Sequence, residues 1–165
     1  MDNNDNKYGK CKIKDIDFSN YSAVIISDYN KGFLLEEDIR FICENHPSVF
    51  IDTKKIIGDY CKDCTYIKIN KDEYEASKFF IQNSEWAIKK VITTLGAKGC
   101  RLENKIYPVE KVEIKDLCGA GDTFIAALCV NYLSSKNIDE AIEFANRCAT
   151  QVVQKKGINI VNEIR

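Results

Sequence analysis

The sequence predicts an α/β fold with a mainly parallel sheet and helices on both of its faces. Short continuous apolar runs, such as SAVIIS at 22–27, are typical of strands that are buried on both sides. The first runs alternate with stretches of helical periodicity, which favours parallel strands joined by right-handed crossovers. A chain of 165 residues suffices for one domain that buries about two thirds of the surface of its unfolded chain.

The elements follow in chain order from these patterns. Residues 1–20 form a polar lead-in that we expect to be poorly ordered, and residues 21–165 form the domain. Apolar residues at helical spacing predict helices over 34–45 and 120–134. The other expected elements are strands at 48–52, 65–69 and 86–95, a hairpin at 100–110 that turns at Asn104–Lys105, helices that open at Asn70 and Ile138, a last strand at 158–161, and core side chains at Phe79, Phe80 and Trp86.

Charge and hydropathy exclude several classes of partner. The formal net charge is −1, so nothing in the overall balance indicates nucleic acid or an anionic membrane surface as a partner. No apolar run approaches the length of a membrane span, and the polar amino terminus lacks the apolar core of a signal peptide. We therefore expect a cytoplasmic protein.

The eight cysteines favour buried, reduced thiols over a disulfide framework, because most of them lie in apolar periodic stretches. Cys61 and Cys64 form one C-x-x-C pair. A structural zinc site needs four ligands, however, and His46 is the only histidine in the chain. A zinc-bound module is therefore the weakest of the functional hypotheses.

The stretch DLCGAGDTF at 116–124 carries the strongest chemical signal. Phe124 stands where a dinucleotide-binding fingerprint needs its third glycine, and no segment supplies a Walker A loop. What remains is a run of backbone N–H groups at Gly119, Ala120 and Gly121 that opens onto a helix amino terminus, an arrangement that binds anions. Asp122 beside it suits phosphoryl transfer to a hydroxyl, but it would equally favour the helix dipole.

Other polar residues lie in the loops that follow strands, where parallel sheets bind their ligands. Asn70 and Glu73 have the spacing of a capping box, which by itself would explain them. Gly96 and Gly99 could simply shape a turn, and Asp28 and Lys31 could be a solvated pair. The loops concerned are 27–33, 52–58, 69–73, 94–99 and 115–122.

Several of these segments resemble the ribokinase-like (PfkB) carbohydrate kinases. DLCGAGDTFIAAL at 116–128 is similar to the second signature of that family, and VITTLGAKG at 91–99 is similar to its strand and nucleotide loop. Asn70–Glu73 matches its N-x-x-E element. SDYNKGFL (27–34), IDTKK (51–55) and ANRCATQVVQKKG (145–157) look most like one branch, the bacterial D-glycero-D-manno-heptose-7-phosphate kinases of lipopolysaccharide core synthesis.

The resemblance implies a role for each matching residue. Asp122 would be the base on the acceptor hydroxyl, with Gly119, Ala120 and Gly121 as the anion hole. ATP and Mg²⁺ would be the cofactors, with Glu73 holding the metal through water. The implied nucleotide contacts are Asn70, Lys71, Asp72, Glu73, Lys54, Thr94, Gly96, Gly99 and Asn146, and the implied sugar-side contacts are Asp28 and Lys31.

The chain also departs from the family pattern. The family's amino-terminal half, with the first signature and the lid over the acceptor, has no counterpart in these residues, which predicts an uncovered sheet edge. Two hypotheses follow: a catalytic half that works on a sugar phosphate with a separately encoded half or a second copy, or a non-catalytic nucleotide-binding module. The smaller departures are Asn30 for glycine, Thr53 for proline, Lys68-Ile69 for Thr-Pro, and Cys118 for threonine.

Overall fold

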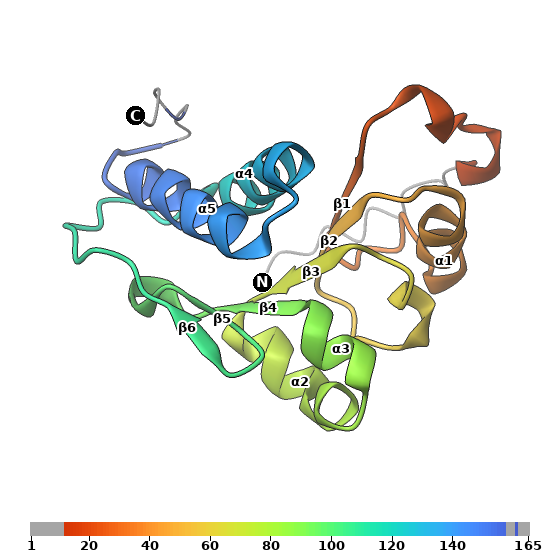
Figure 1. The fold of residues 1–165 in the computed structure, drawn as a ribbon, viewed down its shortest axis with the longest axis horizontal. Coiled ribbons are helices and arrows are strands. Elements are labelled where there is room, and N and C mark those ends of the chain that lie inside the picture. The colour runs from red at the N-terminus through yellow and green to blue at the C-terminus, as the bar shows by residue number, and fades with distance from the viewer. Residues whose placement is uncertain (1–11, 158–160, 162–165) are drawn as a thin grey trace.

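The computed structural model describes residues 12–157 and residue 161, and they form one six-stranded sheet (Figure 1). The strands lie in the order in which they occur in the chain. β1 to β4 are parallel, and β5 and β6 continue the sheet in antiparallel pairing. The strand bounds are β1 Val24–Asp28, β2 Val49–Thr53, β3 Tyr66–Ile69, β4 Val91–Thr94, β5 Cys100–Leu102 and β6 Lys105–Tyr107.

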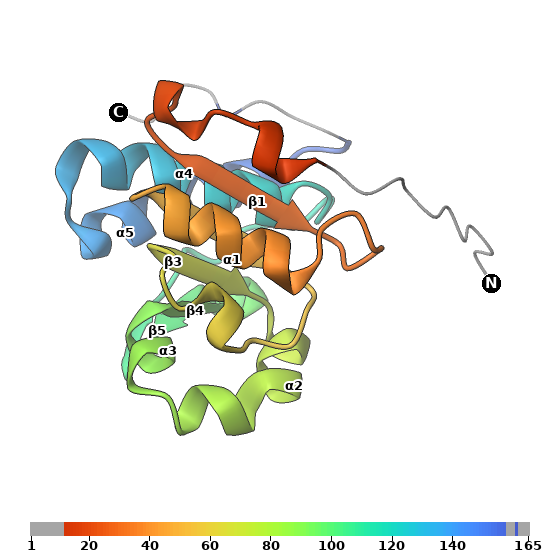
Figure 2. The ribbon, with the colours of Figure 1, turned by 90° about the vertical axis from the view of Figure 1, so that its right-hand side faces the viewer.

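Helices cover both faces of the sheet, as predicted. α1, α2 and α3 pack on one face together with the short 3-10 turn η3, and α4 and α5 pair with each other on the opposite face (Figures 1 and 2). Because the parallel strands follow one another in order, their crossovers all lie on the α1 side. The helix bounds are α1 Glu36–Asn45, η3 Asp59–Cys61, α2 Lys71–Gln82, α3 Glu85–Lys90, α4 Ala120–Ser135 and α5 Ile138–Val153.

Alternation along the strands divides the core into two clusters. In β2, Val49 and Ile51 belong to the cluster under α1, whereas Phe50 belongs to the cluster under α4 and α5. All three side chains are fully buried, as expected for a central parallel strand. The sheet is therefore a rigid platform whose carboxyl edge carries the loops of interest.

β1 differs from the expected strand with two buried faces. Ile26 and Asp28 are buried toward α1, but Ile25, on the α4 face, is 41% exposed. β1 is the outermost strand, and α4 covers this face only in part, as the view onto that edge shows (Figure 2). Val130 on the outer side of α4 is 62% exposed. Among the described residues, this side of β1 therefore presents an exposed apolar surface.

The segment 86–95 also differs from its prediction as a continuous strand. Residues 85–90 form α3, in which Ala87 is fully buried, and only Val91–Thr94 enter the sheet. Phe80 and Trp86 do pack against the core, but Phe79 is 85% exposed, so its assignment to the core was wrong. Phe79 follows Ser77, whose buried hydroxyl accepts the Ile57 amide and so fixes which face of α2 turns inward.

The bounds of the hairpin differ little from those expected from the sequence. The hairpin turns at Glu103–Asn104, one residue earlier than expected, with Glu103 in the left-handed region. Residues 12–20 contain two 3-10 turns whose Ile13 and Phe18 are buried, so this part of the lead-in packs on the domain. Residues 1–11 and most of the expected strand at 158–161 lie outside the described residues. No helix in the described part of the chain is long and apolar enough to cross a membrane.

Gly99 provides a test of the β4–β5 connection. Its φ is +87°, and a Cβ at this position would lie 2.0 Å from the carbonyl oxygen of Tyr107. We expect Gly99→Ala to lower the free energy of unfolding by more than about 2 kcal/mol, because it adds a backbone clash to left-handed strain. Gly96→Ala is the matched control: φ is +59° with no atom within 4 Å, so only the strain of about 1 kcal/mol applies. Denaturant unfolding followed by circular dichroism measures both, and equal losses would contradict the clash.

Candidate active site

The carboxyl ends of the parallel strands bring several polar residues to one edge of the sheet. β1 ends at Asp28, β2 at Asp52 and Thr53, and β3 at Lys68 and Ile69. The next strand joins them, since the Thr94 hydroxyl donates to the Ile69 carbonyl at 3.3 Å. The loops at 52–58, 69–73 and 94–99 therefore meet at this edge, as the parallel topology requires.

The glycine loop, residues 116–122, reaches this edge from the face of the sheet that α4 and α5 cover. Asp116 anchors it, because one carboxylate oxygen accepts the Cys118 amide at 2.9 Å and the other accepts the Gly157 amide at 3.0 Å. These N–H groups hold the pKa of Asp116 below its ordinary value. Gly119 then takes a φ of +76° as the N-cap of α4. The loop is thus tied down on both sides before the helix begins.

Gly121, in the first turn of α4, lies against the end of the Lys68 side chain of β3. A Cβ at this position would lie 2.8 Å from Lys68 Nζ and 3.8 Å from an Asp52 carboxylate oxygen. Lys68 and Asp52 are register neighbours on β3 and β2, and they form an ion pair of 2.8 Å. Their side chains are 9% and 17% exposed. A buried charge pair therefore supports the glycine loop from below.

The backbone donors of the loop match the expected anion hole only in part. The Ala120 amide donates to the Leu117 carbonyl at 3.3 Å, so it is already engaged. Within residues 12–157, the Gly119 and Gly121 amides have no acceptor from the protein. The first-turn amides of any helix lack an intrahelical acceptor, so those of Gly121 and Asp122 are available to an anion.

Asp122 is exposed in the first turn of α4, and Tyr29 of the β1 loop lies close to it. The negative charge of Asp122 is the main reason why the pKa of Tyr29 is raised, and partial burial and Asp52 act in the same direction. The Lys54 ammonium lies 4.7 Å from the centre of the Tyr29 ring. The β1 loop, the end of β2 and the start of α4 therefore converge, although they are far apart in the sequence.

Asn70 and Glu73 form a complete capping box at the start of α2. The Asn70 oxygen accepts the Glu73 amide at 2.9 Å, while the Asn70 amide and side-chain nitrogen donate to the two Glu73 oxygens at 2.7 and 2.9 Å. The structural explanation for this spacing is therefore confirmed. Both Glu73 oxygens are engaged, so neither is left unbonded, but each retains a lone pair that water can use. Lys71 and Asp72 beside them are exposed.

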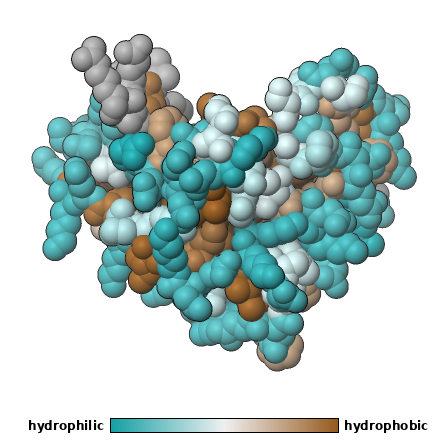
Figure 3. Space-filling view, in the orientation of Figure 1, coloured by the Kyte–Doolittle hydropathy of each residue, from teal (hydrophilic) through white to brown (hydrophobic). Residues whose placement is uncertain are grey.

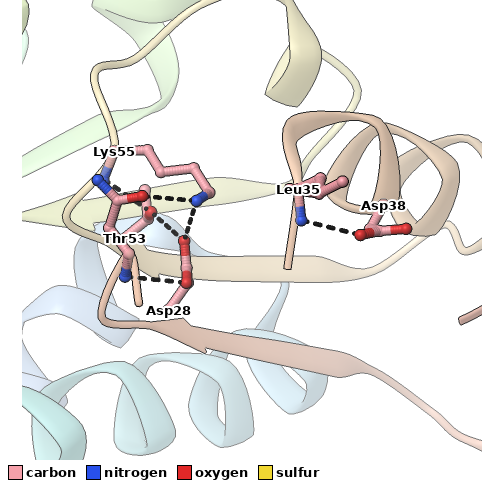
Figure 4. A network of polar contacts seen from close by, with 6 residues as sticks. Asp28, Leu35, Asp38, Thr53 and Lys55 are labelled. Atoms are coloured by element: carbon pink, nitrogen blue, oxygen red, sulfur yellow. Dashed lines mark hydrogen bonds and ion pairs between the residues drawn. The ribbon is translucent and has the colours of Figure 1, made fainter. Parts of the chain in front are cut away.

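Asp28 belongs to a buried polar network and is not a solvated loop residue (Figure 4). Its carboxylate accepts the Thr53 hydroxyl at 3.1 Å and the Asn30 amide at 3.0 Å, and Lys55 Nζ lies 3.3 Å away. Lys55 also donates to the Asn30 side-chain oxygen at 2.7 Å. Asn30 has a φ of +55°, which explains why a glycine is usual here and why asparagine, which tolerates that region, can replace it.

The two other lysines of this edge lie at the surface. Lys31 and Lys54 are both exposed, so Lys55, and not Lys54, is the buried lysine of the IDTKK segment. Neither surface lysine is tied to a carboxylate in the described residues. Both side chains are therefore able to move toward a bound anion.

A groove of about 630 Å³ runs along α5, beside the end of the hairpin. Asn146 lies on its wall, but the side chain is buried and donates to the Tyr107 carbonyl at 3.0 Å, so it ties α5 to the hairpin. The same carbonyl passes close to Gly99. The lining residues are Lys105–Glu110, Glu143, Asn146, Arg147, Thr150, Gln151 and Gln154.

A metal ion fits this edge only in a hydrated form. Within the described residues, no group of three or more His, Cys, Asp or Glu side chains is disposed to hold a metal. Mg²⁺ usually keeps several waters and takes one or two carboxylates together with substrate phosphates. The residues present fit that mode, in which Glu73 would reach the ion through water.

Four residues of the site were not identified from the sequence: Tyr29, Asp52, Lys68 and Asp116. Lys68 had a signal, because it interrupts the otherwise apolar YIKI strand, and a buried lysine needs a partner. Tyr29, Asp52 and Asp116 lie inside segments that carry the family resemblance, but most of their contacts join separate loops, so their roles could not be read from one segment.

Fold and site together define an α/β protein of the ribokinase-like fold, with open amides of a glycine loop and a carboxylate at the carboxyl edge of the sheet. A family model described as pfkB family carbohydrate kinase matches residues 3–165. The chain therefore belongs to the pfkB carbohydrate kinase family. The resemblance seen in the sequence motifs is confirmed.

Curated relatives and solved structures agree with this assignment. The chain is 36% identical over 154 residues to the bifunctional protein HldE of Nitratiruptor sp., and 35% identical over 163 residues to that of Campylobacter curvus. These matches cover 83% and 87% of this chain but only 33% and 35% of those proteins.

Two ribokinases are similar in structure. The ribokinase of Thermotoga maritima superposes with a TM-score of 0.69 at 25% identity, over 88% of this chain and 56% of its own. The ribokinase of Arabidopsis thaliana, solved with ribose and ATP, gives a TM-score of 0.68 at 21% identity, over 84% of this chain and 51% of its own. The chain thus spans about a third of the HldE proteins and about half of these ribokinases.

The reactivity of the thiols tests whether Cys61 and Cys64 are buried, as the structure has them, or accessible, as a zinc-binding C-x-x-C pair would need. Burial raises the pKa of Cys61 to about 11 and that of Cys64 well above its ordinary value, whereas Cys118 in the glycine loop is exposed. Because the thiolate is the nucleophile, we expect iodoacetamide at pH 8 to modify Cys118 long before either buried thiol. A Cys11→Ser variant removes the one cysteine outside the described residues, and peptide mass spectrometry reads the sites. Rapid labelling of Cys61 or Cys64 would contradict their burial.

Proposed function

We propose that this chain is the catalytic part of an ATP-dependent sugar kinase. The observation that carries the proposal is the juxtaposition of the Asp122 carboxylate with the unengaged amides of Gly119 and Gly121 at the edge of the sheet. A phosphoryl group needs donors for its oxygens, and the attacking hydroxyl needs a proton acceptor next to them. Membership of the pfkB family supports assigning both needs to this loop.

The reaction then follows from the roles of the protein groups. ATP supplies the phosphoryl group, and magnesium offsets the charge of its phosphates. Amides of the glycine loop stabilise the oxygens of the group in transfer. Asp122 accepts the proton of the sugar hydroxyl, whose oxygen forms the new bond to phosphorus while the bond to the leaving ADP oxygen breaks. The adenine side of the nucleotide is assigned to the α5 groove that Asn146 and Thr150 line.

The proposed acceptor is a sugar phosphate, with heptose 7-phosphate as the first candidate. Similarity to the HldE proteins and the SDYNKG segment support this choice. Asp28 acts here as a support: its bonds to Thr53 and Asn30 fix the β1 loop, which carries Tyr29 beside Asp122. Lys31, exposed on the same loop, is the residue free to meet the phosphate of the acceptor.

Turnover is proposed to need a further part of the kinase fold. The solved ribokinases extend well beyond the portion matched here, and the open face of β1 leaves Ile25 exposed where more sheet would pack. A base and an anion hole lose most of their effect when the acceptor is not positioned. Nucleotide binding draws on residues 52–157 alone, so it does not depend on that further part.

Nucleotide binding by the isolated chain is the first test. We expect weak, magnesium-dependent ATP binding in calorimetry, and a loss of affinity of about threefold or more in Asn70→Ala and Glu73→Gln, because the start of α2 loses its polar groups beside the phosphates.

The matched control is Asn137→Ala. Asn137 caps α5 through the Asp139 and Glu140 amides, so its removal costs a similar ~1 kcal/mol of stability away from the nucleotide. Equal losses of ATP affinity in Asn70→Ala and Asn137→Ala would reduce Asn70 to a structural cap. An absence of binding at millimolar ATP would remove both the kinase and the nucleotide-module hypotheses.

Substitution of Asp122 tests whether this residue is the catalytic base or only stabilises the start of α4. With the remaining half of the kinase fold supplied in trans from a close relative, we expect the wild-type chain to phosphorylate a sugar phosphate. Asp122→Asn keeps the shape but loses the proton acceptor, so the turnover number should fall by about a hundredfold or more. ATP affinity should not fall, since a negative charge beside the phosphates is removed.

Gly119 is the N-cap of α4, so the structural alternative for Asp122 is an interaction with the helix dipole. That role predicts a loss of stability of up to ~1 kcal/mol in Asp122→Asn and no loss of turnover. Failure of the complemented wild type with every sugar tested would leave the non-catalytic module as the function.

A further inference from the structure

Stability of the fold alone does not explain the Lys68–Asp52 ion pair. It lies in adjacent strands whose other residues are mostly apolar, with side chains only 9% and 17% exposed. Removing two charges from water is unfavourable, and well-packed apolar residues of similar volume often stabilise a fold more.

The position of the pair indicates what it does. Lys68 Nζ lies against Gly121, in the same first turn whose amides are open to an anion. The ammonium group is fixed there by the 2.8 Å bond to Asp52, unlike the exposed Lys31 and Lys54. In a poorly solvated region a charge this close acts strongly on an anion bound at the loop.

The loop otherwise presents negative charge to a phosphate. Asp122 lies in the first turn itself, and Asp52 is near enough, together with Asp122, to raise the pKa of Tyr29. Two carboxylates beside an anion site oppose phosphate binding. Lys68 is the buried cation that offsets them, and Asp52 holds it in place while cancelling part of its attraction.

We propose that Lys68 and Asp52 are positioning residues that set the charge of the glycine-loop anion site, with Lys68 strengthening phosphate binding and Asp52 weakening it. This inference rests on the proposed function, because the anion is taken to be the phosphates of the nucleotide. Neither residue is assigned direct contact with the reacting atoms.

The proposal predicts that two substitutions of similar size, one at Asp52 and one at Lys68, change the affinity for phosphate in opposite directions. Asp52→Asn keeps an oxygen to accept the Lys68 bond but removes the charge, whereas Lys68→Met keeps the length of the side chain. The probes are MgATP and inorganic tripolyphosphate, titrated by calorimetry into the purified chain. We expect Lys68→Met to weaken binding about tenfold, Asp52→Asn to strengthen it about threefold or more, and the double variant to lie between them.

The control is Lys89→Met, which removes a lysine paired with Glu85 at 2.7 Å on α3, on the opposite face of the sheet. It should bind both probes like the wild type. Thermal unfolding of every variant separates lost stability from lost affinity. If Lys68→Met does not fold, Asp52→Asn alone decides, since only the charge-setting role predicts tighter binding.

Each other outcome overturns the proposal. Weaker binding in both single variants means that the pair only supports the fold, and unchanged binding in both means that its charges do not reach the anion. Either result leaves the proposed function standing, because the wild type still binds. A wild-type chain that binds neither probe overturns the proposed function and this inference together.

Discussion

The contact between the first turn of α4 and the end of β3 sets the geometry of the whole site. A Cβ at position 121 would lie 2.8 Å from Lys68 Nζ, so a larger residue there would displace the end of the lysine side chain from its place under the loop. The same close packing holds the loop amides at the carboxyl edge of the sheet. Asp116 and the Gly119 backbone conformation guide the chain into that contact. The position of Asp122 follows, since it is the next residue of the same turn. The two glycines of the loop therefore act differently: Gly119 supplies a left-handed N-cap, and Gly121 leaves room for the end of the Lys68 side chain.

A second buried network organises the other side of the edge. Asp28, Thr53 and Lys55 link β1 to β2, and through Asn30 they hold a loop that would otherwise be free. Partners on three sides satisfy the buried carboxylate, which would be unfavourable if it were left alone. The two ion pairs lie on opposite faces of the sheet, one toward α1 and one toward α4. Each therefore fixes a different loop against the same rigid strands.

The sequence predicted the fold well because its main signals are local. Apolar runs located β2 and β3, helical stripes located α1 and α4, and the capping box located the start of α2. The two errors have different causes. Residues 85–90 carry a local helix signal that the strand prediction overlooked, because Glu, Ala and Lys favour helices and Glu85 pairs with Lys89 at i, i+4. Phe79 is turned outward by the packing of α2 through Ser77. The sequence motifs also located the glycine loop and Asp122, but the groups that surround Asp122 come from β1, β2 and β3, and no pattern within one segment predicts that assembly.

The two sides of the molecule differ in the kind of surface that they expose. Contacts assigned to the nucleotide come from α2, α5 and the groove beside the hairpin, and from the loops after β2 and β4, all of which lie on the well-packed part of the sheet. On the side of β1 the surface is different. Ile25 and Val130 are exposed there, and in the space-filling view the molecule is hollowed between α4 and the segment that leads into β1 (Figure 3). α4 is apolar on nearly all sides, and a helix of that kind is normally buried all round. The described residues thus combine a glycine loop with open amides at the carboxyl edge of the sheet and, beside it, an apolar face that they leave exposed.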